Sequence, residues 1–493
     1  MIGGPFDRLR GASGGLRSNR LVRLVRLSRT IVLLAGLSAL PAAAQQADAP
    51  PSPVRLPTDA AGHRSAAPEP KGGLAEIFRR METAGVYFGA LYTGALVGNV
   101  SGGRKRGSFY GNELLYGFDF DMDRIAGFKN AAFHLTFDTR FGGGVRGNTN
   151  FNGSSIYSLA NQGPVSVTRL TELSYSQLLF DDRVRFLVGR IAPGRDFATA
   201  GFYCRFVSGI CGDLLPYDWS NNSNAAFYPL STWGGRLTVF PTAETYLRVG
   251  AYEANPSQFF DGQWPWDGGW STAGATGVFL PLEVGYEQNP DKVRYARAVS
   301  LGGYWDTSTY DDPLKNRQGK SRPLFGGQPK VDEGRASIYG QFQQTVWRPD
   351  EGRNLILFAG AMVSVYGQGR ISQYGHVGLT GTGLVPGRPD DDLSLVALFA
   401  LLNERVNKAT NDTIKANGGR GRIDRLETIF EANYAVSLRP GIEVKPFTQL
   451  VLNPDQASFP NPDASIRHAW AVGLQFNFAL NGAVGIPVYY RKE

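Results

Sequence analysis

Cysteine and histidine are scarce in this sequence, whose 493 residues include two cysteines and four histidines. So few thiols and imidazoles exclude a disulfide-dense scaffold and most metal-rich proteins. Charged residues make up only 19% of the chain, and after residue 44 there is no apolar run of about 18 residues. This profile fits neither an ordinary helical bundle nor a protein that spans a membrane with helices.

Motifs of common enzyme classes are absent from the body of the chain. After residue 44 there is no G-x-S-x-G, no H-E-x-x-H and no Walker phosphate loop. Scattered Asp and Glu residues would suit a secreted glycosidase, but they would equally suit a polar channel wall. We therefore expect no enzyme activity, no cofactor and no metal.

Aromatic and turn-forming residues are abundant instead. Tyr and Phe together number 51, beside 62 Gly and 29 Pro. A disordered chain rarely carries so many rings, and no Gly-X-Y repeat indicates collagen. The net charge of +8 comes mainly from residues 1–44, which hold seven Arg, no Lys and one Asp. The remainder is nearly balanced, so we expect no nucleic-acid partner.

Residues 1–44 have the three parts of a secretory signal peptide. Arginines at 17, 20, 23, 26 and 29 precede the apolar stretch Thr30–Leu40, and small residues follow up to Ala44. We expect cleavage after Ala44 and export from the cytoplasm. The alternative is a membrane-anchoring helix, although the apolar stretch is short for that role.

The next two boundaries follow from composition. Residues 45–84 are rich in Pro and Ala and predict a periplasmic tether, with a short amphipathic helix over residues 74–81. Residues 85–480 have a period of two. Phe133, Leu135 and Phe137, for example, alternate with polar residues at 134, 136 and 138. Such alternation is typical of β-strands with one apolar and one polar face.

The alternating segments number sixteen. They lie near residues 85–100, 108–122, 130–140, 167–179, 183–191, 232–240, 243–253, 278–288, 293–306, 334–347, 353–367, 371–384, 393–405, 424–438, 442–452 and 467–479.

Short and long connections alternate between these segments, the long ones including 192–231, 254–277, 307–333 and 406–423. Two connections at positions expected to be long, 101–107 and 368–370, are short. This rhythm predicts an all-β fold, a transmembrane antiparallel β-barrel of about 16 strands with short turns at one rim and long loops at the other. Such a barrel satisfies every backbone group in lipid and encloses an aqueous channel. A soluble two-sheet or multi-domain β protein is the alternative. Residues 481–493 would form a C-terminal extension.

Four motifs resemble those of one family and occur in the same order along the chain. They are Gly98–Gly103 (GNVSGG), Gly189–Phe197 (GRIAPGRDF), Trp233–Arg236 (WGGR) and Gly383–Asp391 (GLVPGRPDD). The chain resembles the OprB carbohydrate-selective porins from about residue 85 to residue 478. The resemblance implies a 16-stranded outer-membrane barrel through which sugars, especially glucose, diffuse passively.

Strand alternation nominates polar residues for the channel wall, where they would bond sugar hydroxyls. They are Asp119, Asp121, Asp138, Arg140, Glu172, Arg185, Arg236, Arg248, Glu427 and Glu431. The first matched motif adds Arg190 and Asp196, although alternation puts Arg190 on the Val188 face unless a β-bulge intervenes. The simpler interpretation is that these groups only solvate the wall and pair with one another.

Loop 192–231 is the longest and would fold inward to narrow the pore. Its rings include Phe197, Phe202, Tyr203, Phe206, Tyr217 and Trp219, and loop 254–277 adds Trp264, Trp266 and Trp270. These rings would form stacking platforms for sugars. The alternatives are packing between loops and an interfacial aromatic girdle.

Cys204 and Cys211 lie seven residues apart in the long loop. Since an exported chain meets an oxidising compartment, we expect a disulfide between them rather than a metal site or a nucleophile. The expected partners are carbohydrate solutes and outer-membrane lipid, and monomer and homotrimer both remain open. The rival functions are a secreted polysaccharide-binding protein or glycosidase, and a barrel that serves as an adhesin or in assembly.

Overall fold

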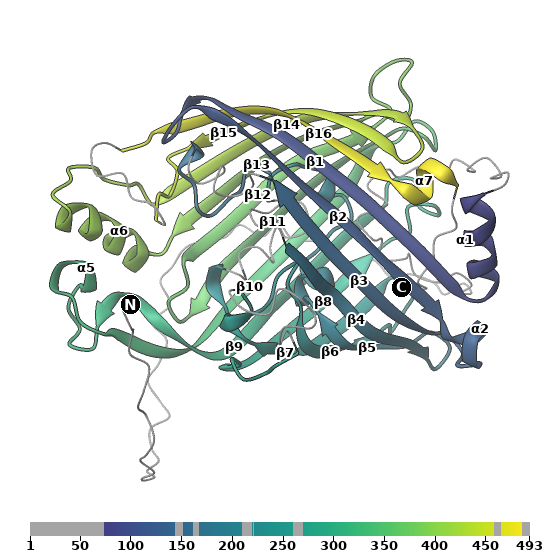
Figure 1. Cartoon of the computed structure of the whole chain (residues 1–493), viewed down its shortest axis with the longest axis horizontal. Coiled ribbons are helices and arrows are strands. Elements are labelled where there is room, and N and C mark those ends of the chain that lie inside the picture. The colour runs from purple at the N-terminus through teal and green to yellow at the C-terminus, as the bar shows by residue number, and fades with distance from the viewer. Residues whose placement is uncertain are drawn as a thin grey trace, which may run out of the picture. The chain divides into compact units, whose positions relative to one another are not determined.

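The computed structural model describes residues 73–142, 151–160, 167–209, 219, 221–259, 270–457 and 465–485. Sixteen strands close into one barrel in which every strand is antiparallel to both neighbours (Figure 1). The ring closes between the first and last strands, where Leu91 of β1 pairs with Ala479 of β16. The predicted sixteen-stranded barrel is confirmed.

The strands follow the predicted segments closely. They are β1 (Val86–Gly102), β2 (Gly107–Asp121), β3 (Ala131–Gly142), β4 (Val167–Leu179), β5 (Val184–Ile191), β6 (Thr232–Val239), β7 (Thr245–Ala254), β8 (Gly277–Glu287), β9 (Arg297–Asn316), β10 (Pro329–Trp347), β11 (Asn354–Tyr366), β12 (Ile371–Thr382), β13 (Asp392–Leu402), β14 (Leu426–Arg439), β15 (Ile442–Leu452) and β16 (His468–Ala479).

The outer face of the wall is apolar and the inner face is mixed. In β8, Leu280, Leu282 and Val284 are exposed, whereas Phe279 and Glu283 at the alternate positions are buried. Because strand geometry sends alternate side chains to opposite faces, the apolar rows face outward, as a lipid-exposed barrel requires. The alternative of a soluble β protein with these rows as its core is therefore wrong.

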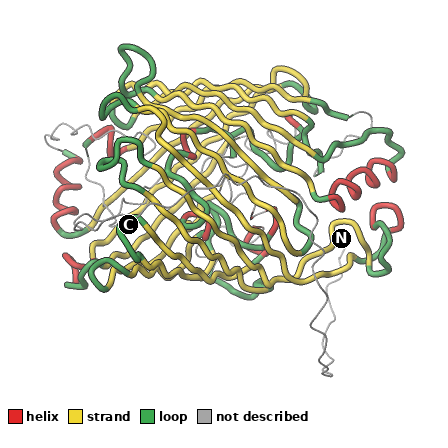
Figure 2. The backbone as a smooth tube through the Cα atoms, turned by 180° about the vertical axis from the view of Figure 1, so that it is seen from behind, coloured by secondary structure: helices red, strands yellow, loops and turns green. Residues whose placement is uncertain are grey.

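The connections at the two ends of the barrel differ in length and in secondary structure. At one end, short turns carry α2 (Met122–Ala126), with α1 (Leu74–Thr83) and α7 (Leu480–Val484) beside them, and α5 (Arg322–Phe325) and α6 (Glu404–Ala416) lie at the other end (Figure 1). Figure 2 shows the slanted strands between these ends from behind. Two predicted loops are partly regular: β9 and β10 extend into 307–333, and α6 occupies much of 406–423. The alternation of apolar and polar residues fades toward the polar tips of these segments, so the sequence pattern did not predict their full extent.

The α1 helix lies where the sequence predicts a short helix, and the Phe78 ring stacks on Phe88 of β1 at 5.5 Å. Among the described residues, no helix is both long and apolar enough to cross a membrane.

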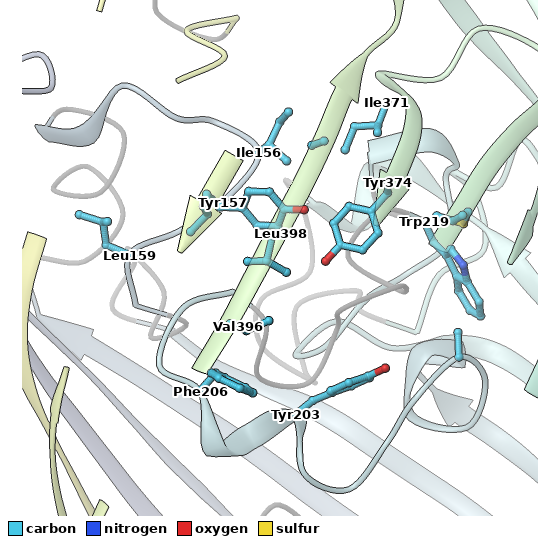
Figure 3. Close-up of a cluster of buried hydrophobic side chains, with 14 of the residues drawn as sticks. Ile156, Tyr157, Leu159, Tyr203, Phe206, Trp219, Ile371, Tyr374, Val396 and Leu398 are labelled. Atoms are coloured by element: carbon cyan, nitrogen blue, oxygen red, sulfur yellow. The ribbon is translucent and has the colours of Figure 1, made fainter. Parts of the chain in front are cut away.

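Two connections fold into the barrel and make its core. Residues 151–160, here called the inner loop, are largely buried, as are residues 196–209, here called the strap. Figure 3 shows Ile156, Tyr157 and Leu159 of the inner loop and Tyr203 and Phe206 of the strap beside the β12 and β13 side chains Tyr374, Val396 and Leu398. The strap belongs to loop 192–231 and lies inside the ring (Figure 3), as predicted for that loop, whereas the narrowing of the pore stays a prediction. The inner loop is a second inward segment, which the sequence did not predict.

Candidate functional site: the narrowed interior of the barrel

The strap contacts the wall along its length. The backbone N–H of Ala198 donates to Glu283 on β8 at 2.7 Å. Farther along, the hydroxyl of Tyr203 donates to Gln341 on β10 at 3.0 Å and lies 3.3 Å from His376 on β12. The strap therefore passes several strands of the wall in turn. Burial raises the pKa of the Tyr203 phenol, so this group stays protonated and donates.

The inner loop is held by two acidic residues, one on the wall and one in the connection after β15. The Ser154 hydroxyl donates to Glu427 of β14 at 2.6 Å. The N–H groups of Ser155 and Ile156 donate to Asp455 at 2.5 and 2.9 Å. The strap and the inner loop also meet directly, because the N–H of Gly209 donates to the carbonyl of Ser158 at 3.1 Å.

Asp455 lies in the connection after β15, where its charge is strongly compensated. Burial alone would raise the pKa of this carboxyl. The guanidinium of Arg370 at 3.0 Å, the Ser155 hydroxyl and the backbone N–H groups outweigh burial, so the pKa of Asp455 lies below its usual value. Asp455 is therefore ionised at neutral pH and fixes the inner loop.

Three ion pairs in the interior share one orientation. In each pair the arginine is the more exposed member: Arg195 with Glu172 at 2.5 Å (20% against 2%), Arg205 with Asp392 at 3.1 Å (12% against 5%), and Arg370 with Asp455 at 3.0 Å (23% against 0%). In each pair the carboxylate is more deeply buried than the guanidinium group. The accessible side of each pair is thus a set of N–H donors with fixed geometry.

These three arginines were not predicted as site residues. Arg195 and Arg205 lie in a connection, where strand alternation says nothing about side-chain direction, and Arg370 directly precedes β12. The only sequence signal was the position of Arg195 next to Asp196 in the matched motif.

Several predicted residues do gather on the inner side. Arg140 donates to Asp138 at 2.7 Å and to Glu113 at 2.9 Å, and its guanidinium lies 5.5 Å from the Tyr228 ring. All three charged groups are buried. This cluster ties the connection that carries Tyr228 to β2 and β3.

The second predicted group lies on β6 and β7 beside the start of the strap. Arg236 pairs with Asp196 at 3.1 Å, and Arg248 pairs with Glu283 at 3.4 Å. Arg236, Asp196 and Glu283 are buried. Arg185 is also buried and lies 5.1 Å from the Phe240 ring.

Asp119 and Asp121 differ from each other. The Asp119 carboxylate lies 2.5 Å from Nδ1 of His134 on the neighbouring strand. Asp121 is the N-cap of α2, where it accepts from the N–H groups of Asp123 and Arg124. Because β2 ends at Asp121, this side chain satisfies a helix terminus at the rim. The pore-lining role of Asp121 stays a prediction.

The prediction that Arg190 lines the pore is wrong. It stands opposite Trp233, which is exposed on the outer face, and its guanidinium lies 5.7 Å from the Trp270 ring. Its Nη2 donates to the Ser231 carbonyl at 2.7 Å. Since directly paired residues share a face, Arg190 lies on the outer side of the wall, as simple alternation indicates. Only the matched motif suggests a pore-lining role for Arg190.

Trp219 is not a stacking platform in this structure. Its side chain is only 1% exposed and contacts the rings of Phe197, Phe279, Tyr304 and Tyr339. This cluster packs the strap against the wall, which agrees with the alternative of loop packing. Trp270 contacts Trp233 at the outer surface, and Tyr217, Trp264 and Trp266 lie outside the described residues.

Cys204 is disulfide-bonded. The other cysteine of the chain, Cys211, lies outside the described residues. The Cys204–Cys211 pairing stays a prediction.

The sequence of residues 105–480 matches the family described as carbohydrate-selective porin, OprB family. The chain belongs to this family. It is 28% identical to Porin B of Pseudomonas aeruginosa over 401 residues, and the aligned region covers 75% of this chain and 83% of that protein. The OprB family is a porin family rather than an enzyme family, and its members place this barrel in the bacterial outer membrane.

Solved structures agree with the OprB fold. The high-pH structure of Pseudomonas putida OprB superimposes with a TM-score of 0.74 at 22% identity and covers 85% of this chain and all of that one. The low-pH structure of the same protein gives a TM-score of 0.52 at 18% identity, over 84% of this chain and all of that one. At these identities the comparison supports the barrel fold. The resemblance found in the sequence motifs is confirmed by the family match.

Proposed function

We propose that this OprB-family porin is a passive channel for monosaccharides such as glucose, and that Arg195, Arg205 and Arg370 form the polar surface that a sugar meets in the narrowed interior. A sugar offers several hydroxyl oxygens as acceptors, and a guanidinium offers up to five N–H donors in one plane. Fixed donors can replace part of the hydration shell of a sugar during its passage.

The orientation of the three ion pairs carries this proposal. Each arginine is held by a carboxylate that is less exposed than the arginine itself. An arginine held in this way loses little conformational entropy when a sugar binds, so a weak and rapidly reversible contact remains possible. Weak binding is what a channel needs, because a tightly held solute would not leave.

The interior carboxylates have structural partners, which supports a channel rather than a hydrolase. Glu172 accepts from Arg195 and from the Ser174 hydroxyl, and Asp455 accepts from the inner loop. Each is engaged in holding a segment in place. We therefore propose no catalytic role for this protein.

Titration of the single-channel current with glucose in planar bilayers tests the proposal. We expect steady conductance that glucose reduces in a saturable way, with a linear polyol of similar mass giving weaker block. The purified protein without sugar sets the baseline. Steady conductance with no saturable effect of glucose, galactose or other monosaccharides would contradict a sugar-preferring channel, and no conductance would favour an adhesin or an assembly barrel.

A further inference from the structure

The two ends of the strap bond to two different carboxylates of the wall. The N–H of Ala198 donates to Oε2 of Glu283 at 2.7 Å. At the other end, the N–H of Val207 donates to Oε1 of Glu431 at 2.7 Å, and the N–H of Ser208 donates to Oε2 at 3.1 Å. Hydrogen bonds from N–H groups to a charged acceptor are stronger than those to a neutral acceptor.

These two carboxylates are far apart on the ring. Glu283 belongs to β8 and Glu431 to β14, six strands away in the closed order of sixteen. Both side chains face inward and are almost fully buried. The strap therefore crosses the interior from one part of the wall to another and does not follow a single side.

Each carboxylate is itself held in one position. Glu283 accepts from the hydroxyls of Tyr246 at 2.9 Å and Tyr339 at 2.8 Å, and Arg248 lies at 3.4 Å. Glu431 accepts from the side-chain amides of Asn433 at 3.0 Å and Gln449 at 3.2 Å. Acceptors fixed by such supporting groups position a bound segment accurately.

The Glu431 end also joins the strap to the inner loop. Gln449 donates to the carbonyl of Leu159 at 2.9 Å as well as to Glu431. Beside it, the N–H of Gly209 reaches the carbonyl of Ser158. One point on β14 and β15 thus holds both segments that fill the interior.

We propose that Glu283 and Glu431 are positioning residues that fix the strap across the interior and so set the upper size limit of the solutes that pass. Neither residue needs to touch the solute. They would act through the position of the strap, since pore diameter is one determinant of selectivity. The inference rests on the proposed function only in taking sugars as the solutes, because the width of the pore also determines its ionic conductance.

Glu431→Gln is the most direct test. A carboxylate accepts both N–H groups, whereas a carboxamide has one acceptor oxygen and an NH₂ group that would oppose the second donor. We expect the single-channel conductance to rise about twofold or more, and the flux of a trisaccharide relative to glucose in liposome swelling to rise about tenfold. Glu283→Gln should change both quantities in the same direction, and Glu431→Ala more strongly than Glu431→Gln.

Glu443→Gln is the matched control. Glu443 lies on β15, and its contacts in the described part of the chain are with Lys445 and Asn477 rather than with the strap. Heat-modifiable mobility in gel electrophoresis verifies the folded barrel for each variant. If neither Glu431 variant folds, Ser208→Pro takes their place, because it removes one N–H donor from the strap and leaves the wall intact.

The outcomes separate the two proposals. Unchanged conductance and unchanged size dependence in folded Glu431 variants overturn the positioning role. A conductance that rises in the variants, in a protein that shows no glucose block at all, would support the positioning role and reject the sugar channel.

Discussion

The side chain of Asn481 donates to the carbonyl of Phe88 at 2.9 Å and accepts from the N–H of Ala90 at 3.3 Å. Register pairing between β1 and β16 stops at Leu91 and Ala479, so these β1 groups lie just beyond the last backbone pair. At the seam where β1 and β16 close the barrel, the side-chain amide of Asn481 thus supplies the hydrogen bonds that strand pairing no longer makes.

Asn481→Ala should destabilise the closed barrel, because two backbone groups at the seam lose their partner. We expect the free energy of unfolding to fall by about 1–3 kcal/mol, the range for buried groups left without hydrogen bonds. Urea unfolding in detergent micelles, followed by tryptophan fluorescence, measures the change. Asn417→Ala, at the exposed C-cap of α6, is the control and should change stability little. Equal effects of the two substitutions would contradict the role of Asn481.

Trp219→Ala should be a stability variant rather than a binding variant. Removing a fully buried indole from a ring cluster typically costs about 3–5 kcal/mol. Trp219→Phe keeps part of the packing and should cost less. In Trp219→Phe, where part of this packing of the strap remains, the glucose block of the folded channels should stay unchanged. A weaker glucose block in Trp219→Phe with normal stability would instead support sugar stacking on this ring.

Substitution of Arg205, Arg195 or Arg370 by Gln should weaken the interaction with sugars. A hydrogen bond to a charged group contributes about 1.5–3 kcal/mol, which corresponds to a roughly tenfold or greater loss of affinity for glucose when one such bond is lost. Current-block titration reports the binding constant. Arg190→Gln is the comparison, since Arg190 lies on the outer face of the wall. Equal block in all four variants would reject the three arginines as the sugar-facing surface.

The pH dependence of stability should include a contribution from Asp455. Its folded-state pKa is lowered, chiefly because Arg370 and the inner loop outweigh the effect of burial. A lowered folded pKa contributes stability above the unfolded value of about 4 and loses it as the pH falls toward the folded value. The difference in unfolding free energy between wild type and Asp455→Asn should therefore be full at pH 6 and shrink below pH of about 4. Asp424→Asn on the exposed rim is the control. A difference that does not change with pH would contradict the assignment.

The predicted Cys204–Cys211 disulfide can be tested by thiol counting. Cys204 is disulfide-bonded, so the denatured, unreduced protein should react with no maleimide, and reduction should expose both thiols. Peptide mass mapping without reductant identifies the pairing within one chain. A cross-linked dimer on a non-reducing gel would show that the bond joins two chains instead.

The barrel was predictable because lipid imposes a local rule. Each strand must place apolar side chains outward at every second position, so Leu280, Leu282 and Val284 reveal β8 within a few residues of sequence. The same rule placed Asp138, Arg140, Glu172, Arg236 and Arg248 on the inner face. It also placed Arg190 on the outer face, where the structure has it.

The connections obey no such rule, and the tertiary structure alone decided where they go. The residues Arg195, Arg205 and Trp219 in the connection between β5 and β6 carry no periodic signal. Their partners Glu172, Asp392 and Tyr304 lie at distant positions in the sequence. What each side chain faces depends on which part of the ring the strap crosses. Strand number and outward face were thus determined by the sequence itself, because membrane burial acts on neighbouring residues. The narrowed interior was decided by long-range contacts to Glu283 and Glu431, which exist only once the ring has closed.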